Sequence, residues 1–129
     1  MHIFFGIAAV LSAAATAGMY WLGLDRFFFW YYPWFDIPLH MVGGLTIGLW
    51  GASLAWRRHY SPFQAFVFIL LLAIAVGSIW ELFEYTSGLT RGELDFWFDT
   101  LKDLGDDIFG ALVAWVCYWI FFVRKDKTI

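Results

Sequence analysis

The sequence predicts an all-α, polytopic membrane protein, in which four transmembrane helices form a compact bundle with an aromatic segment at the membrane interface. Composition is the first reason: 62% of the 129 residues are hydrophobic and only 15% are charged, whereas soluble domains carry about a quarter charged residues. The second is a set of apolar runs near the length of about 20 residues that crosses a hydrocarbon core. We expect a single domain over residues 1–129, with spans at about residues 3–24, 38–56, 63–85 and 108–123 and a helix from about residue 96 that extends the last span.

The first span is rich in Ala and Gly, whose small side chains allow a neighbouring helix to approach closely. A cleaved signal peptide is the alternative, but no Lys or Arg precedes the apolar run. The aromatic block at residues 27–35 follows, and rings of this kind lie at headgroup level. We therefore expect an interfacial loop or short helix there, in preference to a ring-lined substrate site.

The next two spans begin at recognisable helix starts. Pro38 suits the first turn of the second span, and Ser61 followed by Pro62 is a good cap and first-turn pair for the third. Gly43 and Gly44 leave one side of the second span without side chains over that stretch. A polar connection that includes Arg91, Glu93 and Asp95 then leads to the fourth span.

Four spans place both termini on one side of the membrane. Five basic residues share that side, and three lie on the other: Arg57, Arg58, Arg124, Lys125 and Lys127 against Arg26, Arg91 and Lys102. The positive-inside rule therefore predicts an inner-membrane protein with both termini in the cytoplasm. Ten of the eleven acidic residues fall on the outer side, with Asp126 as the exception.

A stripe of acids opens the fourth span. Asp99, Asp103, Asp106 and Gly110 are spaced i, i+4, i+7 and i+11, with Asp107 at the edge of the stripe. An aspartate at the bilayer centre costs about 2.5–3.5 kcal/mol, so the stripe should face protein, water or a cation. The alternative is that these acids only decorate a solvated helix N-terminus, where negative charge is favourable.

Two further pairs of ionisable residues reach the same membrane face. Asp36 and His40 are spaced i, i+4, and Glu81 and Glu84 are spaced i, i+3, so each pair can point from one helix face. Carboxylates crowded at 4 Å repel by about 4 kcal/mol per pair at an effective dielectric near 20. Protonation of some acids, Lys or Arg partners, or a bound cation could offset this repulsion. Because the three basic residues on that side, Arg26, Arg91 and Lys102, cannot neutralise so many acids, we expect a divalent cation, with Mg, Mn, Ca, Fe and Zn all chemically permitted. The predicted ligands are Asp36, His40, Glu81, Glu84, Asp99, Asp103, Asp106 and Asp107.

Other interpretations of these residues remain open. His40 can be a hydrogen-bonded histidine at a helix start, and Asp36 can be a simple helix cap. Ser78, Ser87 or Thr100 could pair with His40 as nucleophile and base, although no spacing selects such a dyad. Thiolate zinc sites are disfavoured by the single cysteine, Cys117, and nucleic-acid binding by the few basic residues, which lie at helix ends.

Three blocks of the sequence resemble the signature blocks of YjdF-type bacterial inner-membrane proteins. They are FDIPLHMVGG at residues 35–44, WELFEY at 80–85, and DTLKD at 99–103 with Gly110-Ala111. They are more distantly similar to the VanZ-like family, whose pattern has an Asp and a His opening one helix, a Glu near the end of another, and an acid, an amide and Gly-Ala in the last. The resemblance covers about residues 35–115 and implies a shared polar set of Asp36, His40, Glu81, Glu84, Asp99, Thr100 and Asp103.

Two positions depart from the VanZ-like pattern. Asp107 stands where that pattern has an Asn, and Glu84 stands where it has a Gln. Both changes make the site more acidic, which favours a cation. The VanZ-like resemblance implies work in the cell envelope, including low-level glycopeptide resistance, with no reaction assigned; the YjdF-type resemblance implies no function.

The combined pattern favours a metal-dependent hydrolase or transferase that acts on a lipid or lipid-linked headgroup, with Glu81 or Glu84 as general base. Whether the protein is an enzyme stays open at this stage. Translocation of protons or cations is one alternative, although the inner halves of the spans are apolar apart from isolated Ser and Thr. A non-catalytic envelope module is the other. The expected partner is the lipid bilayer, and a homo-oligomer is left open.

Overall fold

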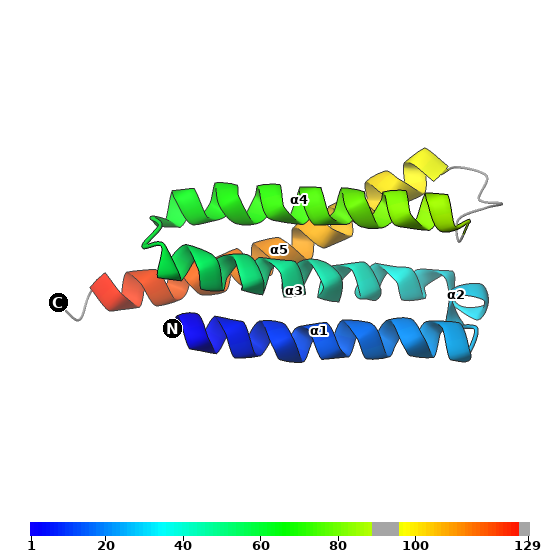
Figure 1. Ribbon diagram of the computed structural model, residues 1–129, viewed down its shortest axis with the longest axis horizontal. Coiled ribbons are helices and arrows are strands. Elements are labelled where there is room, and N and C mark those ends of the chain that lie inside the picture. Colours follow the sequence, from blue (N-terminus) through cyan, green and yellow to red (C-terminus); the bar gives the residue numbers. More distant parts are fainter. Residues whose placement is uncertain (89–95, 127–129) are drawn as a thin grey trace.

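The computed structural model describes residues 1–88 and 96–126, and every regular element in that range is a helix (Figure 1). The elements are α1 (His2–Asp25), α2 (Phe28–Tyr31), the 3-10 helix η1 (Pro33–Phe35), α3 (Asp36–Arg57), α4 (Pro62–Ser87) and α5 (Phe96–Asp126). Four of these helices are long and apolar enough to cross a membrane, which confirms the predicted fold class. Arg91, Glu93, Asp95 and Lys127 lie outside the described residues.

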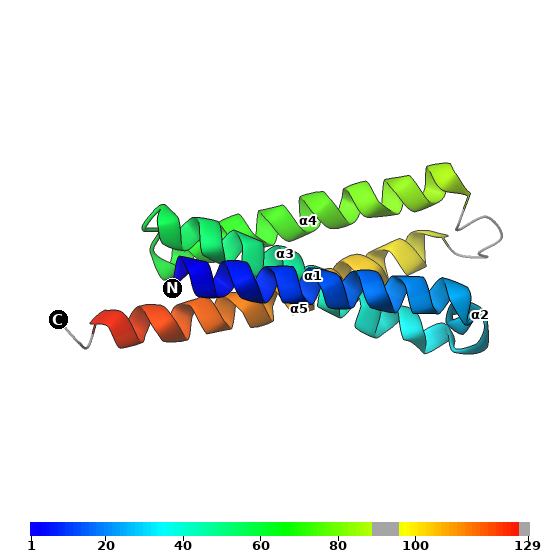
Figure 2. The ribbon, with the colours of Figure 1, turned by 60° about the horizontal axis from the view of Figure 1, so that its bottom comes forward.

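Helix α3 is the central element of the bundle. It packs on α1, α4 and α5, and its contact with α5 is the most extensive in the described chain. Figures 1 and 2 show α1 and α4 on different sides of α3, with α5 crossing the bundle obliquely. The start of α1, the end of α5 and the α3–α4 connection lie at one end, and the aromatic helix α2 lies at the other. The protein is thus an integral membrane protein with four candidate spans, while its orientation in the membrane stays a prediction.

The core is built largely from small side chains. Alanines of all four long helices are buried there, and Phe5, Ile69 and Tyr118 supply the bulk. At the end that carries the termini, the Tyr118 hydroxyl donates a hydrogen bond of 2.6 Å to the Tyr60 carbonyl oxygen. In a membrane the hydrophobic effect does not drive helices together, because lipid chains are as apolar as the side chains. Association depends on close packing, which alanine-rich contacts allow.

The ends of α4 are determined by its local sequence. The Ser61 hydroxyl accepts a hydrogen bond from the Gln64 amide, and the Gln64 side chain accepts one from the Ser61 amide, which completes a capping box ahead of Pro62. Gly88 ends the helix in the left-handed conformation, with φ of 75°, where a residue without Cβ is favoured. These signals fix the depth at which Glu81 and Glu84 lie.

Two glycines bring α3 and α5 into backbone contact. A Cβ on Gly44 would overlap the backbone of Asp107, and a Cβ on Gly110 would overlap the backbone of Met41 and Leu45. Helices can approach this closely only where the facing residues are small. The contact lies within one turn of His40 on α3 and of Asp107 on α5, so it fixes the distance between the ionisable residues of the two helices.

Candidate metal centre

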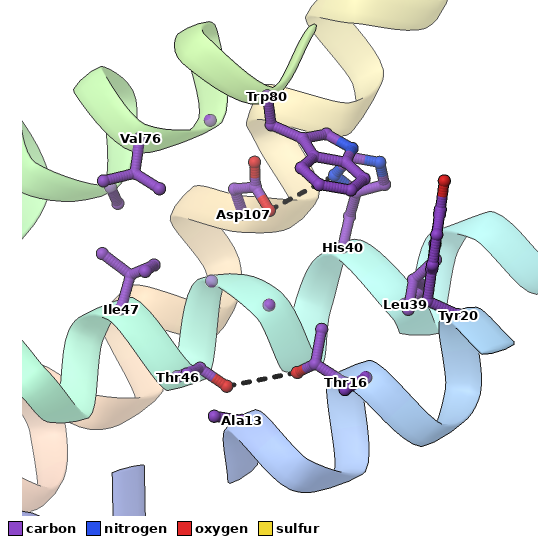
Figure 3. Close-up of a pocket in the computed structure, with 15 residues that line it drawn as sticks. Ala13, Thr16, Tyr20, Leu39, His40, Thr46, Ile47, Val76, Trp80 and Asp107 are labelled. Carbon is purple, nitrogen blue, oxygen red and sulfur yellow. Dashed lines mark hydrogen bonds and ion pairs between the residues drawn. The ribbon is translucent and has the colours of Figure 1, made fainter. Parts of the chain in front are cut away.

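His40 is the centre of a buried polar group between α3 and α5. Its side chain is 6% exposed, and its Nδ1 lies 3.3 Å from Asp107 Oδ1 (Figure 3). Since an ionised carboxylate only accepts hydrogen bonds, this contact fits the tautomer that carries its proton on Nδ1. The lone pair of Nε2 is then available to a ligand. Histidines that bind metals are commonly oriented in this way by a carboxylate on the opposite ring nitrogen.

Two carboxylates face the opposite nitrogen of the same ring. His40 Nε2 lies 3.6 Å from Asp36 Oδ1, one turn earlier on α3, and 3.9 Å from Asp103 Oδ2 on α5. Ligand atoms of these three residues all lie within 4.8 Å of one another. Atoms that share a cation at about 2.1 Å are themselves about 3.0–3.4 Å apart. A cation could therefore be accommodated with small side-chain adjustments.

Lys102 is the positive charge of this group. Its Nζ lies 2.6 Å from Asp103 Oδ1, 3.1 Å from Asp36 Oδ2 and 3.3 Å from Asp99 Oδ1. One ammonium thus faces three carboxylates, which leaves an excess of negative charge. The ammonium contacts Asp36 and Asp103 through the oxygens that do not face His40, so it does not occupy the space in front of Nε2.

Glu81 joins the group from α4. Its side chain is 4% exposed, and its Oε2 accepts a hydrogen bond of 3.1 Å from the Thr100 hydroxyl. Thr100 precedes Asp103 by one turn of α5, which places Glu81 next to the acids of that helix. Glu81 Oε1 is buried without a hydrogen-bond partner, as is Asp106 Oδ2. A buried polar atom without a partner is costly and calls for a proton, water or cation.

Comparison with known proteins supports the membrane assignment. Residues 1–124 match the family described as "Predicted membrane protein (DUF2238)". The chain belongs to the DUF2238 family. No curated protein and no solved structure matches it. The family match carries neither of the two names suggested by the sequence blocks, so the resemblance to YjdF-type and VanZ-like proteins stays a prediction.

This DUF2238 chain brings together only part of the predicted ligand set. Among residues 1–88 and 96–126, one group of His and acidic side chains meets the spacing needed for a shared metal, namely Asp36, His40 and Asp103. Asp107 contacts that group through His40, and Asp99 contacts it through Lys102. Glu81, Glu84 and Asp106 lie outside the three-residue group.

Two interpretations left open by the sequence differ from the observed contacts. Asp36 lies inside the first turn of α3, and the cap position is Phe35, so Asp36 does not cap the helix. Thr100 donates its hydroxyl hydrogen bond to Glu81 rather than to His40. These contacts make Asp36 available to His40 and Lys102, and they tie Thr100 to α4.

Sequence reasoning missed how Gly77 shapes the site, and it counted Lys102 among the bases of this face without predicting which acids it contacts. Gly77 on α4 leaves room for Asp107, because a Cβ there would come within 2.9 Å of Leu104 and still closer to the Asp107 carboxylate. The signal was a lone glycine in a long apolar run. Lys102 follows Asp99 by three residues, a spacing that places the two on one helix face, but its contact with Asp36 depends on the α3–α5 packing.

Proposed function

We propose that this protein binds a divalent cation through Asp36, His40 Nε2 and Asp103, at the outer end of the bundle. The observation that carries the proposal is the convergence of these three ligand atoms within 4.8 Å, with Asp107 on the opposite nitrogen of the imidazole. Two carboxylates and one imidazole leave further coordination positions for water or substrate. Mn, Zn, Fe and Mg all accept this ligand set, with the imidazole favouring the first three.

The cation serves a hydrolase or transferase that acts on a lipid or lipid-linked headgroup. A bound cation polarises a phosphoryl or acyl oxygen and lowers the pKa of bound water. Glu81 is the proposed general base, because its buried Oε1 has no partner and its other oxygen is held by Thr100. It takes a proton from the attacking water, the new oxygen bond forms at phosphorus or carbon, and the departing oxygen takes the proton as its bond breaks.

A second candidate is a non-catalytic envelope module, and the position of Lys102 favours it. The ammonium already joins α3 to α5 through Asp36 and Asp103. In that case the acids stabilise the bundle or bind a partner without chemistry. The two candidates differ in whether a cation is needed.

Metal analysis of the detergent-purified protein tests the site itself. We expect about one divalent ion per chain in the wild type and none in Asp103→Asn, because the variant loses a ligand oxygen charge. Chelator should lower the melting temperature of the wild type but not that of Asp103→Asn, since a ligand at 100 times its Kd stabilises the folded state by about 2.7 kcal/mol. The matched control is Asp25→Asn, which lies in the exposed Asp25–Arg26 pair at the same end. Absence of metal together with no chelator effect would refute the metal site.

Activity assays then test the reaction. The metal-loaded protein should release product from at least one member of a panel of lipid phosphates and lipid esters. Glu81→Gln should retain the metal but lose turnover by a factor of about 10²–10⁴, the usual contribution of a general base. Glu84→Gln is the comparison variant, because the sequence alone does not separate these two residues. A folded, metal-loaded protein that is inactive across the panel would favour the non-catalytic module.

A further inference from the structure

A mostly apolar cavity lies beside this site, within the outer half of the bundle. It has a volume of about 400 Å³ and is bounded by α1, α3 and α4, with Asp107 of α5 at one side (Figure 3). On α4 its lining extends from Ala73 to Trp80, which at 1.5 Å per residue is a length of about 10 Å. That is about one third of the hydrocarbon thickness of a bilayer.

Small residues on three helices create this space. Ala13 and Ala17 of α1, Gly43 of α3 and Ala73 of α4 line it. A Cβ placed on Gly43 would make only van der Waals contacts, the nearest at 3.8 Å to Asp107 Oδ1, so a side chain can start into the cavity from this position without overlap. The remaining walls are mostly hydrocarbon, and Figure 3 shows Ile47 and Val76 facing one another across it from α3 and α4.

The polar groups that line the cavity already have hydrogen-bond partners, so binding of an apolar ligand would not leave them unsatisfied. The Thr16 hydroxyl can donate its proton to the Ser12 carbonyl oxygen, and the Thr46 hydroxyl can donate its proton to the Val42 carbonyl oxygen. The two hydroxyl oxygens lie 3.2 Å apart. Their hydrogen-bonding needs are therefore met without a ligand. His40 and Asp107 belong to the polar group described above. An apolar ligand would leave none of these atoms unsatisfied.

Two of the helices that line the cavity, α1 and α4, hardly touch each other. Helices α1 and α4 make at most marginal contact over the described residues. Their bridge is an edge-to-face contact between Tyr20 and Trp80, with ring centroids 5.5 Å apart. These rings lie at the outer end of the cavity, since both are the outermost lining residues of their helices. The weakly packed side between α1 and α4 is therefore the route by which an acyl chain would enter.

We infer that the cavity holds one hydrocarbon chain of a membrane lipid, with the headgroup of that lipid beside His40. Bilayer hydrocarbon is the medium at this depth, and an apolar cavity of this size does not retain water. Each methylene that leaves water for such a site contributes about 0.8 kcal/mol, but a chain that moves from lipid into protein gains only packing, so binding is expected to be reversible. The position of the headgroup rests on the proposed function; occupancy of the cavity by a chain does not.

Photolabelling tests this inference in the full-length protein. The protein is reconstituted in phosphatidylethanolamine and phosphatidylglycerol vesicles that contain a phosphatidylethanolamine with a diazirine in the middle of one acyl chain, and labelled residues are mapped by mass spectrometry. We expect label on Ile47 and Val76 inside the cavity as well as on Ile79, which is 66% exposed on the outside of α4. Ile79 serves as the internal reference for ordinary lipid contact.

Two variants fill the cavity from different helices. In both Gly43→Leu and Ala17→Leu, label on Ile47 and Val76 should be lost while label on Ile79 remains. Gly18→Leu is the matched control, because nothing lies within 4 Å of a Cβ at that position and it does not line the cavity. An unlabelled cavity in the wild type, or cavity label that persists in both filling variants, would overturn the inference.

Metal analysis on the same samples separates this inference from the proposed function. Cavity label in metal-free Asp103→Asn would show that the chain site stands while the metal is dispensable for it. A wild type that carries metal but shows no cavity label would overturn the chain site alone. A wild type with cavity label and no metal would retain the chain site and refute the metal centre.

Discussion

Gly110→Ala is expected to destabilise the protein far more than the same substitution at Gly105 on the same helix. The new Cβ would overlap backbone atoms of Met41 and Leu45, which cannot move away as a flexible side chain would. Overpacking of this kind costs about 1–3 kcal/mol and occasionally more. We expect a loss at or above the upper end of that range, because the helices themselves must separate. Alanine is favoured over glycine by about 1 kcal/mol in a helix. The measured decrease in the free energy of unfolding is therefore the cost of overpacking minus this propensity gain.

The measurement is thermal or denaturant unfolding in detergent, with Gly105→Ala as the matched control on the same helix. Gly105 is exposed, and nothing lies within 4 Å of a Cβ at that position, so Gly105→Ala should be neutral or slightly stabilising. Gly110→Ala should also weaken metal binding, because separation of α3 from α5 moves Asp103 and Asp107 away from His40. Equal stability of the two variants would mean that the close crossing does not contribute to folding.

The fold could be predicted from the sequence because its signals are local. Four apolar segments long enough to span a membrane predict four helices without knowledge of their contacts. Ser61, Pro62 and Gly88 act within a few residues of their own positions, and the structure shows the capping box and the left-handed cap that such residues form. The aromatic block at residues 27–35 likewise forms short helices, α2 and η1, at the end of the bundle.

The arrangement of the acids could be predicted only in part. Their convergence at one membrane face follows from helix spacing and from counting spans. Which carboxylate reaches His40 depends on the angle and separation at which α5 crosses α3, and both depend on Gly44 and Gly110. The predicted stripe placed Asp107 at its edge, whereas the structure buries Asp107 with Asp103 and leaves Asp99 and Asp106 half-buried. The cavity depends on the packing of three helices, so no local sequence pattern predicts it.

Lys102→Met is expected to make the stability of the protein depend strongly on a divalent cation. Removal of the ammonium leaves Asp103, which is 2% exposed, and Asp36 without a positive partner. Breaking a buried ion pair in this way costs about 3–5 kcal/mol, and we expect the lower end because the side chain of Lys102 is 29% exposed. A cation bound by Asp36, His40 and Asp103 would restore the missing positive charge through the other oxygens of the same carboxylates.

Melting curves in chelator and in saturating Mn²⁺ separate these contributions. In chelator the variant should melt well below the wild type, and in Mn²⁺ most of that difference should disappear. Arg26→Met is the control at the same end of the bundle, because Arg26 is 67% exposed and, among the described residues, forms its ion pair with its neighbour Asp25. The variant should therefore melt close to the wild type in either condition. If the melting temperature of Lys102→Met is lower than that of the wild type by the same amount with and without Mn²⁺, Lys102 itself is the counter-charge that the acids require. The acidic group would then be a structural ion-pair network, and its excess negative charge would have to be met by protons.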